Sequence, residues 1–280
     1  MTVADLIAEA GRRLASQYST EEIRSISFLL AEHFDGIGSA AFYACRDTVL
    51  QSAERIEDAI SRLEEGCPLQ YVLGYALFCG HRFRVREGSL IPRPETEELV
   101  TTIIEDYSDF VPRDGQFNVL DMCTGSGCIA YSLASAFPEA MVYGCDISED
   151  ALAIACGQRI KLHGARPVFF SADINCPPPA GLPEFDIIVS NPPYIMEREK
   201  ACMRKNVLDY EPEMALFVPD DNPLSFYRSI KSWADALLKP EGALYLEVNE
   251  KLADETSALF PGSRVGKDIN SKPRFVISRN

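Results

Sequence analysis

The 280-residue sequence predicts an α/β fold, in which a mostly parallel sheet carries helices on both faces and follows a small helical bundle. Two features predict it. Apolar residues recur at helical spacing up to about residue 66, whereas strand-like runs alternate with helix-like stretches from Pro94 onward. We therefore expect a helical amino-terminal domain over residues 1–74, a β-hairpin linker over 75–93 and an α/β domain over 94–280.

Three helices are expected in residues 1–74. Ser19 and Glu22 form a capping-box pattern that begins the second helix, and Gly66 with Pro68 ends the third. The apolar positions that should face the core of this bundle are Leu6, Ile7, Ala10, Leu14, Ile23, Ile26, Leu30, Phe34, Ile56, Ile60 and Leu63.

Short β-like pieces follow, Tyr75 to Phe78 and Arg82 to Val85, and they predict the hairpin. Beyond it we expect a seven-stranded sheet whose last strand is antiparallel, with helices beginning near Gly127, Ser148, Pro223 and Glu250. Six of the strands can be placed: Asn118 to Asp121, Met141 to Asp146, Val168 to Ala172, Asp186 to Ser190, Ala243 to Val248 and Arg274 to Ser278.

The charge balance is acidic. The chain has 42 acidic and 27 basic residues, a net charge of −15, which would repel a nucleic-acid backbone. The excess favours solubility, or a protein partner with basic patches. Because the chain has no long apolar run and no signal-like start, we expect a cytoplasmic protein without membrane contact. We also expect a monomer.

The nine cysteines predict neither disulfides nor a metal site. Their number is odd, and a chain of this size does not need disulfides for stability. Cys123 and Cys128 are five residues apart in a glycine loop, and the sequence offers only His33, His81 and His163 to join them. We therefore expect reduced thiols and no metal.

A glycine-rich turn lies between a buried strand and a helix at residues 119–130. Glycine lets a ligand approach the backbone closely, and Asp146, at the end of the next strand, can accept the hydroxyls of a ribose. Gly125 to Ala130 also fits the dinucleotide fingerprint. This Rossmann-like pattern therefore serves NAD or S-adenosylmethionine equally well.

Asp173 and Ile174 follow the third strand. Methyltransferases commonly bind the adenine amino group with an acid at this place, and Ile174 would contact the adenine ring. An aspartate at a strand end can instead cap the helix that follows it. Both interpretations stay open.

The tetrapeptide from Asn191 to Tyr194 (Asn-Pro-Pro-Tyr) follows the fourth strand, where open α/β sheets bind ligands. The side-chain oxygen of Asn191 and the carbonyl of Pro192 can form a rigid pair of acceptors, because prolines restrict the backbone. An NH2 group has two donors to match them. Tyr194 would lie against a planar group, so the motif predicts methylation of an uncharged, planar nitrogen.

An amide nitrogen is a poor nucleophile, because its lone pair is delocalised into the carbonyl. Two fixed acceptors raise its electron density, and proximity to the methyl donor supplies much of the acceleration. The motif has no evident use in hydride transfer, so it favours methyl transfer over a dehydrogenase. The same motif occurs in adenine-N6 methyltransferases of DNA and RNA, so it alone does not name the substrate.

Three longer segments of the sequence resemble segments of a known enzyme family. Pro68 to Gly74, Ile91 to Val100 and Tyr210 to Leu216 resemble segments of the peptide chain release factor N5-glutamine methyltransferases, the PrmC/HemK family, and the likeness extends over nearly the whole chain. This implies a class I S-adenosylmethionine-dependent methyltransferase fold. Departures lie at Val248 to Glu250 and at Asp268 to Arg274, near the last strands.

The resemblance implies roles for single residues. The cofactor S-adenosylmethionine, which leaves as S-adenosylhomocysteine, would contact Cys123, Thr124, Gly125, Ser126, Gly127, Asp146, Ile174 and Asn191. Asn191, Pro192, Pro193 and Tyr194 would hold the glutamine of a release factor's Gly-Gly-Gln loop, with Asn191, Pro192 and Tyr194 as catalytic residues. The helical domain and the hairpin would recognise the body of that protein, and methylation would tune translation termination.

The sequence also allows three alternative functions. A related enzyme methylates a glutamine of a large-subunit ribosomal protein and carries the same tetrapeptide, although Arg93 to Thr96 favours the release factor type. An adenine-N6 methyltransferase would bind nucleic acid in a salt-sensitive manner. A cofactor-binding scaffold without turnover is the non-enzymatic possibility.

Overall fold

The chain folds into two units. The computed structural model describes residues 1–110, 112 and 115–279. One unit comprises Met1–Gly74 together with Arg204–Tyr210, and the other comprises Tyr75–Met203 and Glu211–Asn280. A segment from the second half of the chain therefore belongs to the helical unit.

The first unit is helical, and the expected capping box is confirmed. The backbone N–H of Ser19 donates to the Glu22 carboxylate at 2.8 Å, and Glu22 N–H donates to the Ser19 hydroxyl at 3.3 Å. The helix they begin ends at Gly36, whose φ of 67° suits glycine. The helices are α1 (Val3–Leu14), α2 (Thr20–Asp35), α3 (Ser39–Ala44), α4 (Ala53–Glu64), α5 (Leu69–Leu73) and α9 (Lys205–Tyr210).

The predicted apolar positions form the core of this unit, except that Ile7 and Phe34 are only half-buried. The pattern did not reveal α3 and α5, because five or six residues do not establish a helical period. It also did not place α9 here. The Tyr210 hydroxyl donates to the backbone carbonyl of Glu65 at 3.4 Å, a contact across 145 positions of sequence.

The expected hairpin is present in the second unit as β1 (Tyr75–Phe78) and β2 (His81–Arg84), which pair antiparallel. Phe78 and Phe83 are almost fully buried and belong to the core that covers one face of the large sheet. The hairpin is thus packed into the second unit.

The large sheet has seven strands in the order β10-β11-β9-β6-β3-β4-β5. The pairs from β9 to β5 are parallel, and β11, the last strand of the chain, is antiparallel to both neighbours, as predicted. The strands are β3 (Asn118–Met122), β4 (Met141–Asp146), β5 (Val168–Ser171), β6 (Phe185–Ser190), β9 (Leu238–Glu247), β10 (Arg264–Lys267) and β11 (Pro273–Arg279).

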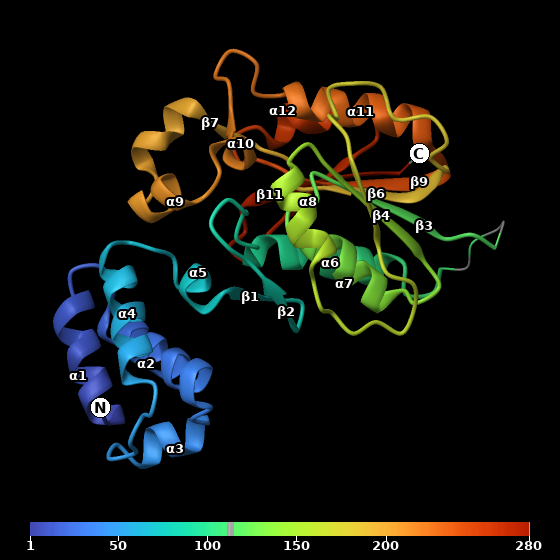
Figure 1. Cartoon of the computed structure of the whole chain (residues 1–280). Helices are drawn as coiled ribbons and strands as arrows, with labels where there is room; N and C mark the ends of the chain where they lie inside the picture. Colours follow the sequence, from blue (N-terminus) through green and yellow to red (C-terminus); the bar gives the residue numbers. More distant parts are fainter. Residues whose placement is uncertain (111, 113–114, 280) are drawn as a thin grey trace. The chain divides into compact units, whose positions relative to one another are not determined.

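Helices cover both faces of this sheet (Figure 1), with α6 and α7 on one face and α11 and α12 on the other. A 3₁₀ helix, η1 (Glu197–Cys202), and a two-stranded parallel sheet of β7 (Ile195–Met196) and β8 (Phe217–Val218) follow the fourth main strand. The α-helices of this unit are α6 (Pro94–Asp106), α7 (Cys128–Ala136), α8 (Glu149–Cys156), α10 (Glu213–Leu216), α11 (Ser225–Leu237) and α12 (Ala253–Ala258).

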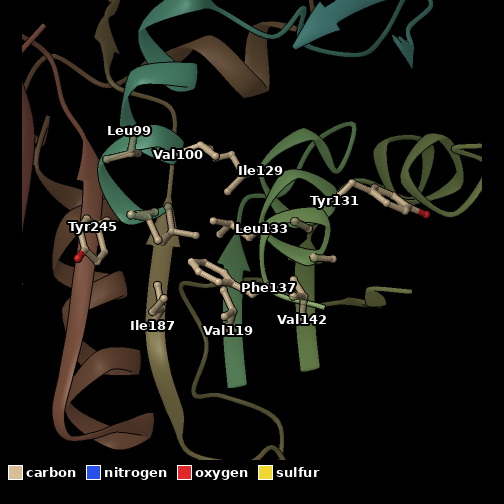
Figure 2. Packing of buried hydrophobic residues seen from close by; sticks show 14 of the residues in the cluster. Leu99, Val100, Val119, Ile129, Tyr131, Leu133, Phe137, Val142, Ile187 and Tyr245 are labelled. Carbon is tan, nitrogen blue, oxygen red and sulfur yellow. The ribbon is translucent and has the colours of Figure 1, made fainter. Parts of the chain in front are cut away.

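Alternation along the strands explains the two layers. In β3, Val119 belongs to the core under α6 and α7, whereas Leu120 belongs to the core under α11. Strands buried on both faces are continuously apolar, which is typical of a parallel sheet. Figure 2 shows the first of these cores, where Ile129 and Leu133 of α7 lie over Val119 and neighbouring strand residues.

Two parts of the sheet differ from expectation. The seventh strand, β10, was not placed from sequence, because its four residues are only partly buried or exposed and show no apolar run. The long strand β9 begins at Leu238 and not at Ala243, because Leu238 already pairs with Phe185 of β6, and the register shifts between this pair and the pair of Ile187 with Ala243. Among the described residues, no helix has both the length and the apolarity needed to cross a membrane.

Two leucines of the second unit allow a matched test of the core. Leu133 is fully buried in α7, whereas Leu77 of β1 is 62% exposed. We expect Leu133→Ala to lower the free energy of unfolding by about 2–5 kcal/mol, because it leaves a cavity. Leu77→Ala should change it by less than about 0.5 kcal/mol. Urea denaturation followed by circular dichroism measures both, and equal losses would contradict this account of the core.

Candidate active site

A cavity of about 310 Å³ lies at the carboxyl ends of the parallel strands, where ligands bind in folds of this kind. Residues at or just after the ends of four strands line it. They are Cys123 and Gly125 after β3, Asp146 at the end of β4, Asp173 and Ile174 after β5, and Asn191 and Pro193 after β6. The structure therefore brings together these seven residues, which the sequence had singled out.

Thr124, Ser126 and Gly127 do not line the cavity, although they were expected to contact the cofactor. The Thr124 hydroxyl donates to buried Asp121 at 2.6 Å, and the Ser126 carbonyl accepts from Gln158 at 3.1 Å. Gly127 has a φ of 79°, and a Cβ there would lie 3.1 Å from the Phe169 ring. These three residues shape and support the loop.

Other lining residues were missed in the sequence. They come from the segment after β2, from the segment that follows the tetrapeptide, from α11, and from the residues just after β4 and β5. The first two segments adjoin or overlap stretches that carry the family resemblance, which was the available signal. The missed residues include Gly88, Ser89, Leu90, Pro212, Met214, Ala215, Phe217, Pro219 and Phe226.

Asp146 holds the glycine loop in place. One carboxylate oxygen accepts from Gly125 N–H at 2.9 Å and the other from Ser148 N–H at 2.9 Å. Burial raises the pKa of Asp146, and these backbone hydrogen bonds oppose the rise. Because each carboxylate oxygen can accept more than one hydrogen bond, Asp146 keeps the capacity to accept a ligand's hydroxyl groups.

Cys123 has a left-handed backbone conformation, with a φ of 58°. Such a conformation costs a side-chain-bearing residue about 1–2 kcal/mol, and the tight turn between β3 and α7 imposes it. Burial raises the pKa of the Cys123 thiol well above its ordinary value. The thiol of Cys123 therefore stays neutral beside the cavity.

The tetrapeptide is fixed at the end of β6. The Ser190 hydroxyl donates to the Met122 carbonyl at 2.7 Å, which ties the end of β6 to the end of β3. Pro192 and Pro193 are buried, and Pro193 borders the cavity while Pro192 and Tyr194 do not. The side chain of Tyr194 is thus directed elsewhere.

The partners of the motif come from distant segments. The Asn191 amide NH2 donates to the Thr96 hydroxyl at 3.1 Å, and the Tyr194 hydroxyl donates to Glu247 at 2.8 Å. The amide of Asn249 donates to the Tyr194 carbonyl at 3.1 Å. Both ends of Tyr194 are therefore held by the end of β9 and the residues just beyond it.

Two segments that carry the family resemblance meet near the site. Glu211, which is 4% exposed, accepts from Arg93 at 2.6 Å and from Ile91 N–H at 3.1 Å. A buried carboxylate needs such partners to offset its desolvation. Glu211 therefore joins the start of α6 to the chain that returns to the cavity after α9.

Comparison with known proteins shows to which class of proteins this chain belongs. Residues 119–207 match the model of a methyltransferase domain, and residues 5–74 match the model of the PrmC N-terminal domain. The glycine loop lies inside the first match. The chain therefore contains a methyltransferase domain, and the loop is not that of an NAD-dependent dehydrogenase.

The curated relatives narrow the class to a family. The release factor glutamine methyltransferase of Bacteroides thetaiotaomicron is 42% identical over 93% of this chain and 94% of its own. Those of Flavobacterium psychrophilum and Bacillus subtilis are 39% and 35% identical, over 94% and 97% of this chain and 94% and 93% of theirs. This chain belongs to the release factor glutamine methyltransferase family.

Asp121 offers a test of charge burial beneath the loop. Its carboxyl is fully buried, one of its oxygens has no hydrogen-bond partner among the described residues, and burial raises its pKa from 3.8 to about 7. Between these values the folded state keeps a proton that the unfolded state has lost. Stability should therefore fall as pH rises through this window, by about 1.4 kcal/mol per pH unit from this group.

Asp121→Asn removes this titration. The free energy of unfolding of the variant, measured relative to wild type by urea denaturation at pH 4.5, 5.5 and 6.5, should increase steadily with pH. A constant difference between the two proteins would contradict the assignment.

Proposed function

We propose that this protein transfers the methyl group of S-adenosylmethionine to the side-chain amide nitrogen of the glutamine in the Gly-Gly-Gln loop of a peptide chain release factor. The observation that carries the proposal is the position of Asn191 and Pro193 on the same cavity as Asp146 and the glycine loop. Relatives of similar length, named release factor glutamine methyltransferases, support the substrate.

The cavity suits the cofactor. Asp146 would accept the ribose hydroxyls, the backbone at Cys123 and Gly125 would lie against the amino acid part, and Ile174 would contact the adenine ring. Asp173 would accept from the adenine amino group. One of its oxygens already accepts from Asn175 N–H at 2.9 Å, so the second oxygen would serve the ligand. When bound, S-adenosylmethionine supplies an electrophilic methyl group beside Asn191.

Asn191 and Pro192 would activate the amide nitrogen of the substrate glutamine. The Asn191 side-chain oxygen and the Pro192 carbonyl accept the two amide hydrogens of the substrate, which favours pyramidalisation as the methyl approaches. Asn191 Nδ2 is directed towards Thr96, and this supports the presence of Oδ1 on the opposite side of the amide. The nitrogen becomes acidic only after methylation, so no strong general base is required.

Tyr194 calls for a changed role. We expected its ring to lie against the substrate amide, but its hydroxyl is bound to Glu247 and it does not line the cavity. We propose that Tyr194 supports the shape of the motif, while the two prolines border the glutamine. We propose that Asn191 and Pro193 contact the ligands directly.

Methyl transfer from a sulfonium needs no metal, since the leaving group is already activated. The acidic chain, with a net charge of −15, favours a protein partner with basic patches over direct contact with nucleic acid. We further propose that the helical unit recognises the body of the release factor, and that the protein works as a monomer in the cytoplasm without membrane contact.

Asn191→Ala tests the catalytic role. Because the loss should fall mainly on the transition state, we expect methylation of a purified release factor to be abolished while the Kd for S-adenosylmethionine changes by less than about tenfold. Incorporation of labelled methyl groups and isothermal titration measure the two effects. The exposed Asn270→Ala is the matched control and should behave as wild type. Full activity of Asn191→Ala would refute the mechanism.

Asp146→Ala tests the cofactor site. Loss of hydrogen bonds to a buried carboxylate typically costs about 1.5–3 kcal/mol each, so the Kd for S-adenosylmethionine should rise by at least about tenfold. The control is Asp150→Ala, because Asp150 lies nearby in α8 with its side chain 81% exposed. Thermal melting verifies that both variants are folded, and an unchanged Kd in folded Asp146→Ala would show that the ribose assignment is wrong.

A further inference from the structure

A buried hydroxyl lies between the tetrapeptide and a buried carboxylate. Thr96, in the first turn of α6, is 2% exposed, and Glu247, at the end of β9, is fully buried. The Thr96 hydroxyl donates to Glu247 Oε2 at 2.6 Å and receives a hydrogen bond from Asn191 Nδ2 at 3.1 Å. A chain of two hydrogen bonds thus connects the carboxylate to the side-chain amide of Asn191.

The direction of these hydrogen bonds determines which end of the Asn191 amide faces the cavity. The oxygen and the NH2 group of an amide have nearly the same shape, so hydrogen-bonding partners decide its orientation. A hydroxyl has a single hydrogen. If Thr96 gives that hydrogen to Glu247, it can only accept from Asn191, and the Asn191 NH2 group must face Thr96. The Asn191 oxygen is then presented on the opposite side.

The surroundings of Glu247 favour its role as an acceptor. Its second oxygen accepts from the Tyr194 hydroxyl at 2.8 Å, so both oxygens receive hydroxyl hydrogens. Burial raises the pKa of Glu247 and the charge of Glu95 adds to this, whereas the two hydroxyls and the positive charge of Arg274 oppose it. Tyr194 has a pKa well above its ordinary value, so it stays protonated and remains a donor.

We propose that Thr96 and Glu247 are positioning residues, which turn the Asn191 side-chain oxygen towards the substrate amide and hold it there. This inference rests on the proposed methylation of a glutamine amide, and it explains how an otherwise symmetric side chain presents an acceptor and not a donor. The same carboxylate also binds Tyr194, so a single buried group orients the first and last residues of the tetrapeptide.

Thr96→Val is the first test, because valine keeps the shape and removes the hydroxyl. We expect kcat for methylation of a release factor to fall by about 10–100-fold, since loss of one oriented polar group at a reacting centre has effects of this order or somewhat larger. The KM for the release factor and the Kd for S-adenosylmethionine should change by less than about threefold. Thr96→Ser restores the hydroxyl and should recover kcat to within about threefold of wild type.

Thr102→Val is the matched control. Thr102 lies in the same helix and its hydroxyl donates to the Glu98 carbonyl at 2.9 Å, away from the tetrapeptide. The change removes an equivalent hydroxyl from α6, and kcat should equal that of wild type. A loss in Thr102→Val as large as in Thr96→Val would mean that α6 is merely destabilised, and would overturn the proposal.

Glu247→Gln tests the direction of the hydrogen bonds between Glu247, Thr96 and Asn191. The new amide can donate to the Thr96 oxygen, which frees the Thr96 hydrogen for Asn191 and favours the reversed amide, with its NH2 group towards the cavity. We expect a larger loss of kcat than in Thr96→Val. Selectively labelled protein gives a direct reading by NMR, because the nuclear Overhauser effect between the Asn191 side-chain NH2 and the Thr96 methyl should be strong in wild type and weaker in folded Glu247→Gln.

Failure of the positioning role and failure of the proposed function give different results. Wild-type kcat in Thr96→Val, equal loss in Thr96→Ser, or an unchanged Overhauser effect in Glu247→Gln would overturn the positioning role while leaving the function standing. A wild-type protein that transfers no methyl group to any release factor would overturn the proposed function, and the inference with it.

Discussion

The pairing of β3 with β6 is the constraint on which the candidate site depends. These strands run parallel and in register, with Met122 opposite Ser190, and the Ser190 hydroxyl binds the Met122 carbonyl at 2.7 Å. The glycine loop and the tetrapeptide begin at the next residue of each strand. Because parallel neighbours end at the same edge of a sheet, the cavity and the tetrapeptide are adjacent.

Contacts across long stretches of sequence then refine this arrangement. Thr96 and Glu247 approach the tetrapeptide from α6 and β9, and Asn249 holds its backbone. Glu211 joins the start of α6 to the returning chain. Each contact uses a carboxylate or an amide in a water-poor place, where a partner is costly to lose. The precision of the site therefore comes from polar groups that the sheet and helices bury together.

The departure from family pattern noted at Val248 to Glu250 has a structural counterpart. Asn249 occupies the position just beyond β9, where its amide donates to Tyr194 and to Glu199. A residue without a polar side chain could not make these contacts. In this chain a side chain just beyond β9 therefore supports the tetrapeptide. The same Asn249 side chain also binds Glu199 of η1.

The sequence by itself determined the classes of element and the types of reactive residue. Periodicity located α1, α2 and α4, strand-like runs located six strands of the large sheet, and strand-end positions marked Asp146 and Asn191. These are local signals, since spacing and turn chemistry act over a few residues. Short or polar elements such as α3, α5 and β10 were missed, because they are too brief to show a period.

Only the tertiary structure decided which groups meet. It separated Cys123 and Gly125, which line the cavity, from Thr124, Ser126 and Gly127, which support the loop. It also placed Thr96 between Asn191 and Glu247, residues 95 and 151 positions away from it in the sequence. No local pattern encodes such a contact, because hydrogen-bond partners are selected by packing, and packing depends on the whole fold.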